Sequence, residues 1–326
     1  MTNILIILVA LLIIATLVQF LRVGELLSDV RNLEVNEVTE KDNKTQSIIM
    51  GAVGALFLAS FFWQYFSWNH LLLPSASSEH GLIIDELMAF TMILIIIVFF
   101  ITHVILFYFL VKYRKSSDND VAYFYPHNNK LEYIWTVAPT IVLTAVILYG
   151  LSTWEKITNA DTSNSAVIEV FAKQFGWSAR YPGDDNTLGK HDYKLIKGIN
   201  GLGIDMNDQF SLDDKVTLEV HLVVDKPVLL KFRSQDVIHS AYLPHFRVQM
   251  NCVPGMSTQF AFTPNKTTKQ MKEQEGSDFE YVLLCNKICG VAHYNMQMRF
   301  IVDTQEEYDQ WISEQKTLSS KLLTQN

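Results

Sequence analysis

Cysteine is the scarcest of the reactive residues in this chain, with three among 326 residues. Three cysteines cannot build the disulfide framework of a small secreted protein, and the lack of a CxxCH motif excludes covalent haem attachment. Charge is also sparse, at 18% of residues, and the formal net charge is −8. This negative balance argues against nucleic acid as a partner and favours a basic one.

Charged residues are missing from four long apolar stretches, residues 4–21, 48–68, 87–111 and 134–151. Each stretch is long enough to cross a bilayer as a helix, so we expect four transmembrane helices. The first stretch has the length of a signal peptide, but no basic residue precedes it and no small-residue cleavage site follows. We therefore interpret it as a retained membrane anchor.

Lys and Arg are absent from residues 69–86, which join the second and third stretches. The two neighbouring loops contain the basic residues Arg22, Arg31, Lys41, Lys44, Lys112, Arg114, Lys115 and Lys130. Because loops rich in Lys and Arg stay in the cytoplasm, this pattern predicts that both chain termini lie outside.

From Trp154 onward the chain changes to short runs rich in β-branched and aromatic residues. The runs AVIEVFA, VTLEVHLVV, PVLLKF, FEYVLLC and MQMRFIV are separated by turn-forming clusters such as YPGDDN and VPGM. This pattern predicts an all-β sandwich or barrel outside the membrane. Residues 304–322 are typical of a polar terminal helix with Tyr308, Trp311 and Ile312 on one side. The expected domains are a two-helix membrane extension (1–68), a transmembrane hairpin (69–153) and a β domain (154–326).

Two of the three cysteines lie four residues apart in CNKICGVAHYNM, residues 285–296. Thiolate and thioether sulfurs are soft ligands and imidazole is borderline, and the loop offers these donors on Cys285, Cys289, His293 and Met296. They suit copper, whereas zinc does not favour methionine and an iron–sulfur cluster would need four cysteine sulfurs. The alternative is that Cys285 and Met296 are ordinary core residues. The joint spacing of the four donors argues against that alternative.

The number of metal ions and one ligand stay open on the residues alone. One thiolate with a histidine and a weak methionine would form a mononuclear blue-copper site, whereas a second thiolate permits two bridging sulfurs and two ions. Spacing does not choose the remaining histidine, because the β domain also contains His221, His239 and His245.

CNKICGVAHYNM, with the upstream SQDVIHSAYLPHFRVQMNCVPGM, resembles the copper A (CuA) domain of subunit II of haem–copper cytochrome c oxidases. That family has the pattern C-x-E-x-C-x3-H-x2-M after a D-V-x-H-S stretch. NNKLEYIWTVAPTIVL and AKQFGWSARY extend the resemblance over residues 85–303, and the first two helices lie outside the family's usual two-helix plan. The resemblance implies a cupredoxin-like β domain that binds two copper ions.

The resemblance also implies the copper ligands, which are two bridging sulfurs and a further pair of donors for each ion. The bridging sulfurs would be those of Cys285 and Cys289; the pairs would be His239 with Met296, and His293 with the backbone carbonyl of Lys287. No metal role is implied for His221, His245 or Cys252.

The function implied by the resemblance is that of an oxidoreductase subunit. It would accept electrons from a c-type cytochrome and pass them to subunit I, which reduces oxygen to water and translocates protons. The chain itself would contain no haem and no catalytic residue, and it would lie in a bacterial inner membrane with the CuA domain in the periplasm. Its partners would be subunit I, other oxidase subunits, lipid and the cytochrome donor, free or held in a respiratory supercomplex. A membrane-anchored copper-binding or delivery protein is the alternative from a different class.

Three positions depart from the family pattern near the copper ligands. Lys287 stands where the family has a glutamate that also binds magnesium at the contact with subunit I. Asn251 and Gln249 replace a usual aspartate and lysine. A magnesium site is therefore in doubt, and we hypothesise that the Lys287 ammonium occupies the place of the ion. The alternative is a lysine that reaches solvent.

Two aromatic residues and one acid match positions of the family that carry electrons or protons. Phe175, in KQFGW, stands where the family has the tryptophan that accepts electrons, and Trp177 matches a second tryptophan. Both are candidate electron relays, although Trp177 suits core packing equally well. Glu132, in NNKLEYIWT, matches a glutamate at the mouth of a proton uptake path. Helix chemistry also explains it, because Asn129 and Glu132 have N-cap and N3 spacing.

Overall fold

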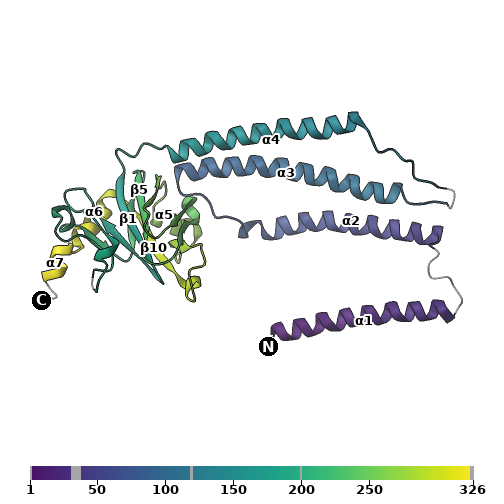
Figure 1. Ribbon diagram of the computed structural model, residues 1–326, viewed down its shortest axis with the longest axis horizontal. Helices are drawn as coiled ribbons and strands as arrows, with labels where there is room; N and C mark the ends of the chain where they lie inside the picture. Colours follow the sequence, from purple (N-terminus) through teal and green to yellow (C-terminus); the bar gives the residue numbers. More distant parts are fainter. Residues whose placement is uncertain (1, 31–37, 118–119, 199, 324–326) are drawn as a thin grey trace. The chain divides into compact units, whose positions relative to one another are not determined.

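The computed structural model describes residues 2–30, 38–117, 120–198 and 200–323, and Arg31 of the first basic loop lies outside them. The chain divides into two compact units. One contains Met1–Asn69 and Ile95–Asn128, and the other contains His70–Leu94 and Asn129–Asn326. Along the chain, four long helices precede a β domain with short terminal helices (Figure 1), which confirms the predicted order of elements.

The four long helices are α1 (Thr2–Val30), α2 (Glu40–Trp68), α3 (Glu79–Lys112) and α4 (Asn129–Thr158). Within the described residues, three segments are long and apolar enough to cross a membrane: Glu40–Leu71, Glu79–Lys112 and Asn129–Thr158. Helix α1 covers the first predicted stretch, residues 4–21, and its crossing of a membrane stays a prediction. The apolar helices thus make the chain a membrane-anchored protein.

Helix α2 begins at a capping box and packs closely against α3. The Thr39 hydroxyl accepts a hydrogen bond from the Asp42 N–H at 3.2 Å, and the Asp42 carboxylate accepts one from the Thr39 N–H at 3.0 Å. Further along α2, a Cβ atom at Gly54 would lie 2.3 Å from the ring of Phe107 on α3. Glycine therefore sets how closely these two helices approach.

The β domain contains two five-stranded sheets, which confirms the predicted sandwich. The first sheet has the order β3 (Lys215–Thr217), β2 (Gly176–Tyr181), β1 (Ala166–Lys173), β5 (Val228–Ser234) and β8 (Thr258–Phe262). The second has the order β4 (Val220–Val223), β10 (Gln297–Asp303), β9 (Tyr281–Cys285), β6 (His239–Leu243) and β7 (Val248–Cys252). The pairs β1–β5 and β4–β10 are parallel, and the other pairs are antiparallel.

Burial along the strands locates the core. Strand β10 buries alternate residues, Met298, Phe300 and Val302, as expected of a strand with one face on the core. The central strands β1 and β5 are instead buried almost continuously. Both of their faces are therefore covered, one by apolar residues and the other by the charged groups described next.

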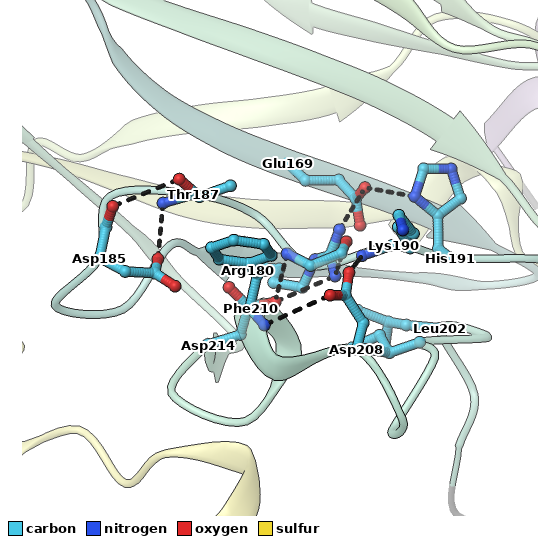
Figure 2. A network of polar contacts seen from close by, with 12 residues as sticks. Glu169, Arg180, Asp185, Thr187, Lys190, His191, Leu202, Asp208, Phe210 and Asp214 are labelled. Carbon is cyan, nitrogen blue, oxygen red and sulfur yellow. Dashed lines mark hydrogen bonds and ion pairs between the residues drawn. The ribbon is translucent and has the colours of Figure 1, made fainter.

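A buried charge network covers the second face of β1 and β5 and holds the long β2–β3 connection, residues 182–214 (Figure 2). The carboxylate of Glu169 accepts hydrogen bonds from Arg233 at 2.7 and 2.9 Å and from Arg180 at 3.1 Å. Arg180 also donates to Asp214 at 3.1 Å, and His191 lies 3.8 Å from Glu169. Burial raises the pKa of Glu169, but the arginines outweigh it and the pKa lies below its ordinary value.

One predicted strand proved to be two. The run VTLEVHLVV forms β3 and β4, which belong to different sheets. The chain changes sheet at Leu218 and Glu219, and Leu218 is 79% exposed. The run alternates apolar and polar residues across this point without a break, so it gave no signal of this crossing.

The expected C-terminal helix is present in two pieces, α6 (Gln305–Glu314) and α7 (Leu318–Leu323), and the remaining helix, α5 (Thr268–Glu275), follows β8. Tyr308, Trp311 and Ile312 pack on the core as predicted. Helix α6 ends because Gln315 is extended and the following backbone turns to the β2–β3 connection, where Leu318 N–H donates to the Asp214 carbonyl.

The start of α3 is joined to the β6–β7 turn within the same compact unit. Arg247 donates two hydrogen bonds to the Asp85 carboxylate, at 2.8 and 2.9 Å. The Ser78 hydroxyl donates to the Phe246 carbonyl at 2.7 Å. Strand β6, which begins with His239, is therefore held at its far end by the residues at the start of α3.

Candidate metal centre

Two neighbouring strands and one loop supply the predicted copper ligands. His239 is the first residue of β6, and Cys285 is the last residue of β9, with which β6 pairs. The other ligands lie in residues 286–296, and the Cys285 N–H closes this loop by donating to the Met296 carbonyl at 3.0 Å. The Asn286 N–H donates to the Ser240 carbonyl at 2.9 Å, which fixes the loop to β6. The ligand positions are thus set by strand pairing.

The six predicted donors converge on a pair of sulfurs. The Sγ atoms of Cys285 and Cys289 lie 3.8 Å apart, too far for a disulfide, in which sulfurs are about 2.05 Å apart. An ion between them could bond to both at the ordinary metal–thiolate distance of about 2.3 Å. The remaining donors lie near one or other sulfur: the Lys287 carbonyl (3.3 Å) and His239 Nδ1 (3.8 Å) at Cys285, and His293 Nδ1 (3.6 Å) and Met296 Sδ (3.7 Å) at Cys289.

Burial and donor chemistry both fit a soft metal. His239 is fully buried, and Cys285, Cys289 and Met296 are at most 8% exposed, while His293 is half-buried. Burial and the neighbouring Cys285 raise the pKa of Cys289 to about 11, so this thiol keeps its proton at neutral pH unless a metal displaces it. The carbonyl, imidazole and thioether groups that face the two sulfurs carry lone pairs, which can bind a metal cation.

Spacing did not show which of three histidines of the β domain faces the sulfurs, but the structure does. His239 faces the sulfurs, whereas His221 lies 2.5 Å from Asp303 and stacks on Trp311 at 3.9 Å between ring centroids. The ring of His245 packs against two aromatic rings of the core edge, at 5.0 and 5.5 Å. Cys252 is buried, and burial raises its pKa to about 12, which suits an unreactive core thiol.

An outer layer of hydrogen bonds, which sequence reasoning missed, orients His239. Its Nε2 lies 2.9 Å from Oδ1 of Asp236, so the carboxylate holds the proton on Nε2 and leaves the Nδ1 lone pair towards Cys285. The other oxygen of Asp236 accepts from the Gln174 N–H at 2.7 Å. Burial raises the pKa of Asp236, but these hydrogen bonds outweigh it and the pKa is lowered. Asp236 could have been found as the aspartate of the D-V-x-H-S stretch.

The two aromatic candidates lie beside the metal loop. Trp177 is 5% exposed, and its ring centroid is 6.0 Å from that of His239, at 62°. Phe175 is 37% exposed and covers Gly290, where an added Cβ atom would lie 2.7 Å from its ring. One candidate is therefore a core residue next to a ligand, and the other is at the surface.

Glu132 lies far from the metal centre, and Lys287 reaches it through its backbone carbonyl. Glu132 is in the first turn of α4, which already begins at Asn129, so Asn129 is the first helical residue rather than the cap. Twenty-six residues of helix separate Glu132 from Thr158, a rise of roughly 40 Å. The Lys287 residue is exposed, and its ammonium has no ion pair within the part of the chain that the structure describes.

Two family models match this chain. The transmembrane domain of cytochrome c oxidase subunit II matches residues 66–153, and the periplasmic domain of the same subunit matches residues 166–304. The chain belongs to the cytochrome c oxidase subunit II family. Helix α1 and almost all of α2 lie outside both matches, so this member carries two helices more than the usual hairpin.

Relatives of known name agree with the family. An alternative cytochrome c oxidase subunit 2 of Bradyrhizobium diazoefficiens is 33% identical over 225 residues, 68% of this chain and 76% of the relative. Cytochrome c oxidase subunit 2 of Synechocystis is 23% identical over 82% of each chain. Among solved structures, the periplasmic domain of subunit II of the cytochrome oxidase of Bradyrhizobium japonicum is 23% identical, with a TM-score of 0.32, over 46% of this chain and 93% of that one.

Proposed function

We propose that this chain is the electron-accepting subunit of a haem–copper cytochrome c oxidase, with a binuclear CuA centre. The observation that supports this most directly is the pair of sulfurs 3.8 Å apart with four further donors around them. The proposed ligands are Cys285, Cys289, His239, His293, Met296 and the backbone carbonyl of Lys287.

The number of donors favours two ions over one. A tetrahedral ion would use four donors and leave two of these six without a partner in a buried site. Two ions that shared both sulfurs would use all six; as the family resemblance implies, His239 and Met296 would hold one ion, and His293 and the Lys287 carbonyl the other. With two coppers bound, the centre would supply one-electron transfer with the unpaired electron shared by both ions.

The chain's own residues keep this site rigid and dry. Strands β6 and β9 fix two ligands, and the hydrogen bond from the Cys285 N–H to the Met296 carbonyl closes the loop that carries the others. Asp236 fixes the ring and the tautomer of His239. Small movements of the ligands between redox states keep the cost of each transfer low, which is what an electron relay requires.

Electrons are proposed to arrive from a c-type cytochrome in another chain and to leave to subunit I. Phe175, at the surface beside Gly290, and Trp177, against His239, lie where a relay towards the ligands would need them. We place the β domain on the periplasmic side of a bacterial inner membrane, with both termini outside. On the cytoplasmic side, Glu132 is proposed to assist proton uptake into subunit I.

The exposed Lys287 is proposed to replace the family's magnesium ion at the contact with subunit I. Its ammonium can meet the same carboxylate and carbonyl oxygens as a point charge. A metal analysis of the assembled oxidase checks this: we expect no magnesium that depends on residue 287. Magnesium that is retained in the native complex and lost with Lys287→Met would contradict it.

Single-turnover kinetics of the assembled oxidase test the electron role. A reduced c-type cytochrome should be oxidised rapidly by the wild-type complex and not by a complex that carries Cys285→Ser. Equal rates in both would contradict the proposal. A copper-delivery protein, the alternative from a different class, would instead release its copper to a Cu(I) chelator, and no observation on this chain favours it.

A further inference from the structure

The two-residue turn between β1 and β2 contacts both the segment that carries His239 and the loop that carries Cys289. Its backbone contribution is the N–H of Gln174, which donates to Oδ2 of Asp236 at 2.7 Å. The other oxygen of Asp236 lies 2.9 Å from Nε2 of His239. Asp236 thus links the turn to His239, a proposed ligand on β6.

The side chain of the same residue reaches the cysteine loop. The Gln174 amide Nε2 donates to the backbone carbonyl of Cys289, 115 positions further along the chain. Beside it, the Phe175 ring covers Gly290, whose φ of +139° and lack of a side chain allow that approach. Contacts to Cys289 and Gly290 therefore hold the loop at its centre, between its two closed ends.

The residue types in the turn point to the same role. Two-residue hairpin loops favour Asn-Gly, Asp-Gly or Gly at the first position, because they need a positive φ. The last paired residues here are Lys173 and Gly176, so the loop is Gln174-Phe175; it contains neither Asn nor Gly, and neither of its residues has a positive φ. Local turn chemistry does not explain Gln174, whereas its two contacts to the metal loops do.

We propose that Gln174 is a positioning residue that fixes the two ligand loops of the copper centre relative to each other. It holds Asp236, and through it His239, at one end, and the Cys289 carbonyl at the other. Any effect of Gln174 on bound copper rests on the proposed CuA function, whereas its contacts to Asp236 and Cys289 are made between protein groups alone. Gln174 lies at an exposed turn, so its replacement should leave the sandwich folded.

The test compares Gln174→Leu with Lys173→Leu in the full-length chain in detergent. Both variants put leucine at an exposed position, Gln174 in the turn and Lys173 directly before it, and only the first removes the amide that holds Cys289. In metal-free protein, iodoacetamide labelling of Cys289, followed by mass spectrometry, should be about three- to tenfold faster in Gln174→Leu, the effect of one lost hydrogen bond. Lys173→Leu should match the wild type. Labelling of Gln174→Leu within twofold of the wild type would overturn the proposal.

A second readout separates this proposal from the proposed function. Copper-loaded Gln174→Leu should keep two coppers per chain but show altered copper hyperfine splitting and faster loss of copper to a chelator, with unchanged thermal unfolding. If the wild type itself fails to bind two coppers, the proposed function falls and the labelling result still decides the role of Gln174. If the wild type binds two coppers and Gln174→Leu has the same spectrum and labelling rate, only the inference on Gln174 falls.

Discussion

The β domain contains two buried polar clusters that are built in opposite ways. In the charge network, the carboxylate of Glu169 meets the guanidinium groups of Arg180 and Arg233 at 2.7 to 3.1 Å, so the protein supplies both signs. In the donor cluster, the thiols of Cys285 and Cys289 lie 3.3 to 3.8 Å from each other and from a carbonyl, two imidazoles and a thioether, all of them groups that can bind a soft metal.

The difference separates a cluster whose charges the protein balances itself from one that could hold a metal ion. A buried charge is tolerated when an opposite charge pairs with it, and the network around Glu169 meets that condition by itself. Within the described residues, no protein cation contacts the two sulfurs, and His239, Cys285 and Cys289 are close enough together to hold a metal ion, as we propose. The predictions below test whether the two clusters separate in this way.

Removing a bridging sulfur should have the largest effect. Cys289→Ser takes away a donor that both ions would share, so we expect the binuclear centre to be lost. Copper analysis and EPR of the purified chain measure this. Cys252→Ala is the matched control, because Cys252 is a buried core thiol that should not affect copper. Two coppers per chain in Cys289→Ser would contradict the ligand set.

Breaking the charge network should instead lower the free energy of unfolding and leave copper binding unchanged. Glu169→Gln takes the carboxylate partner from Arg233 and leaves Arg180 only Asp214, which should reduce the free energy of unfolding by about 3–5 kcal/mol. Thermal unfolding by circular dichroism measures it, and the folded fraction should keep two coppers. Glu280→Gln, which loses an exposed pair with Arg299, should cost less than about 1 kcal/mol. Similar effects of the two variants would remove the distinction.

The pH dependence of stability should reveal the raised pKa of Asp214. Burial raises the pKa of Asp214 to about 7, against 3.8 for the ordinary group, despite the charge of Arg180. The folded state therefore holds this proton more tightly than the unfolded state, and stability should fall as pH rises from about 4 to about 7. Asp214→Asn should remove that part of the slope in melting temperatures measured across this range. Parallel curves for the wild type and the variant would show that Asp214 ionises normally.

The smallest effect is expected at Met296. Methionine is a weak ligand, so Met296→Leu should keep two coppers and shift the reduction potential and the EPR splitting. Redox titration of the copper-loaded chain measures the shift. A variant that loses one copper would make Met296 a required ligand rather than a tuning one.

The sequence showed the donor cluster far better than the charge network. Cys285, Cys289, His293 and Met296 fall within twelve residues, so their spacing alone indicated a metal. His239 lies 46 positions before Cys285, and only the pairing of β6 with β9 brings them together. Spacing therefore could not choose His239, and the family resemblance was needed.

The other features that the sequence did not predict also depend on contacts between segments far apart in the chain. Glu169, Arg180, Arg233 and Asp214 come from separate strands and connections, and each charge alone predicts an exposed residue. Gln174 contacts Cys289 across 115 positions, and no local pattern marks that contact. The split of VTLEVHLVV and the break between α6 and α7 depend on which distant backbone each segment meets.

Whether this chain holds a binuclear copper centre is decided by copper stoichiometry together with EPR of the purified full-length chain. We expect two coppers per chain and a seven-line hyperfine pattern, because one unpaired electron would be shared by two copper nuclei. One copper per chain with a four-line or silent spectrum, or a disulfide between Cys285 and Cys289 in the electron-transferring state, would contradict it.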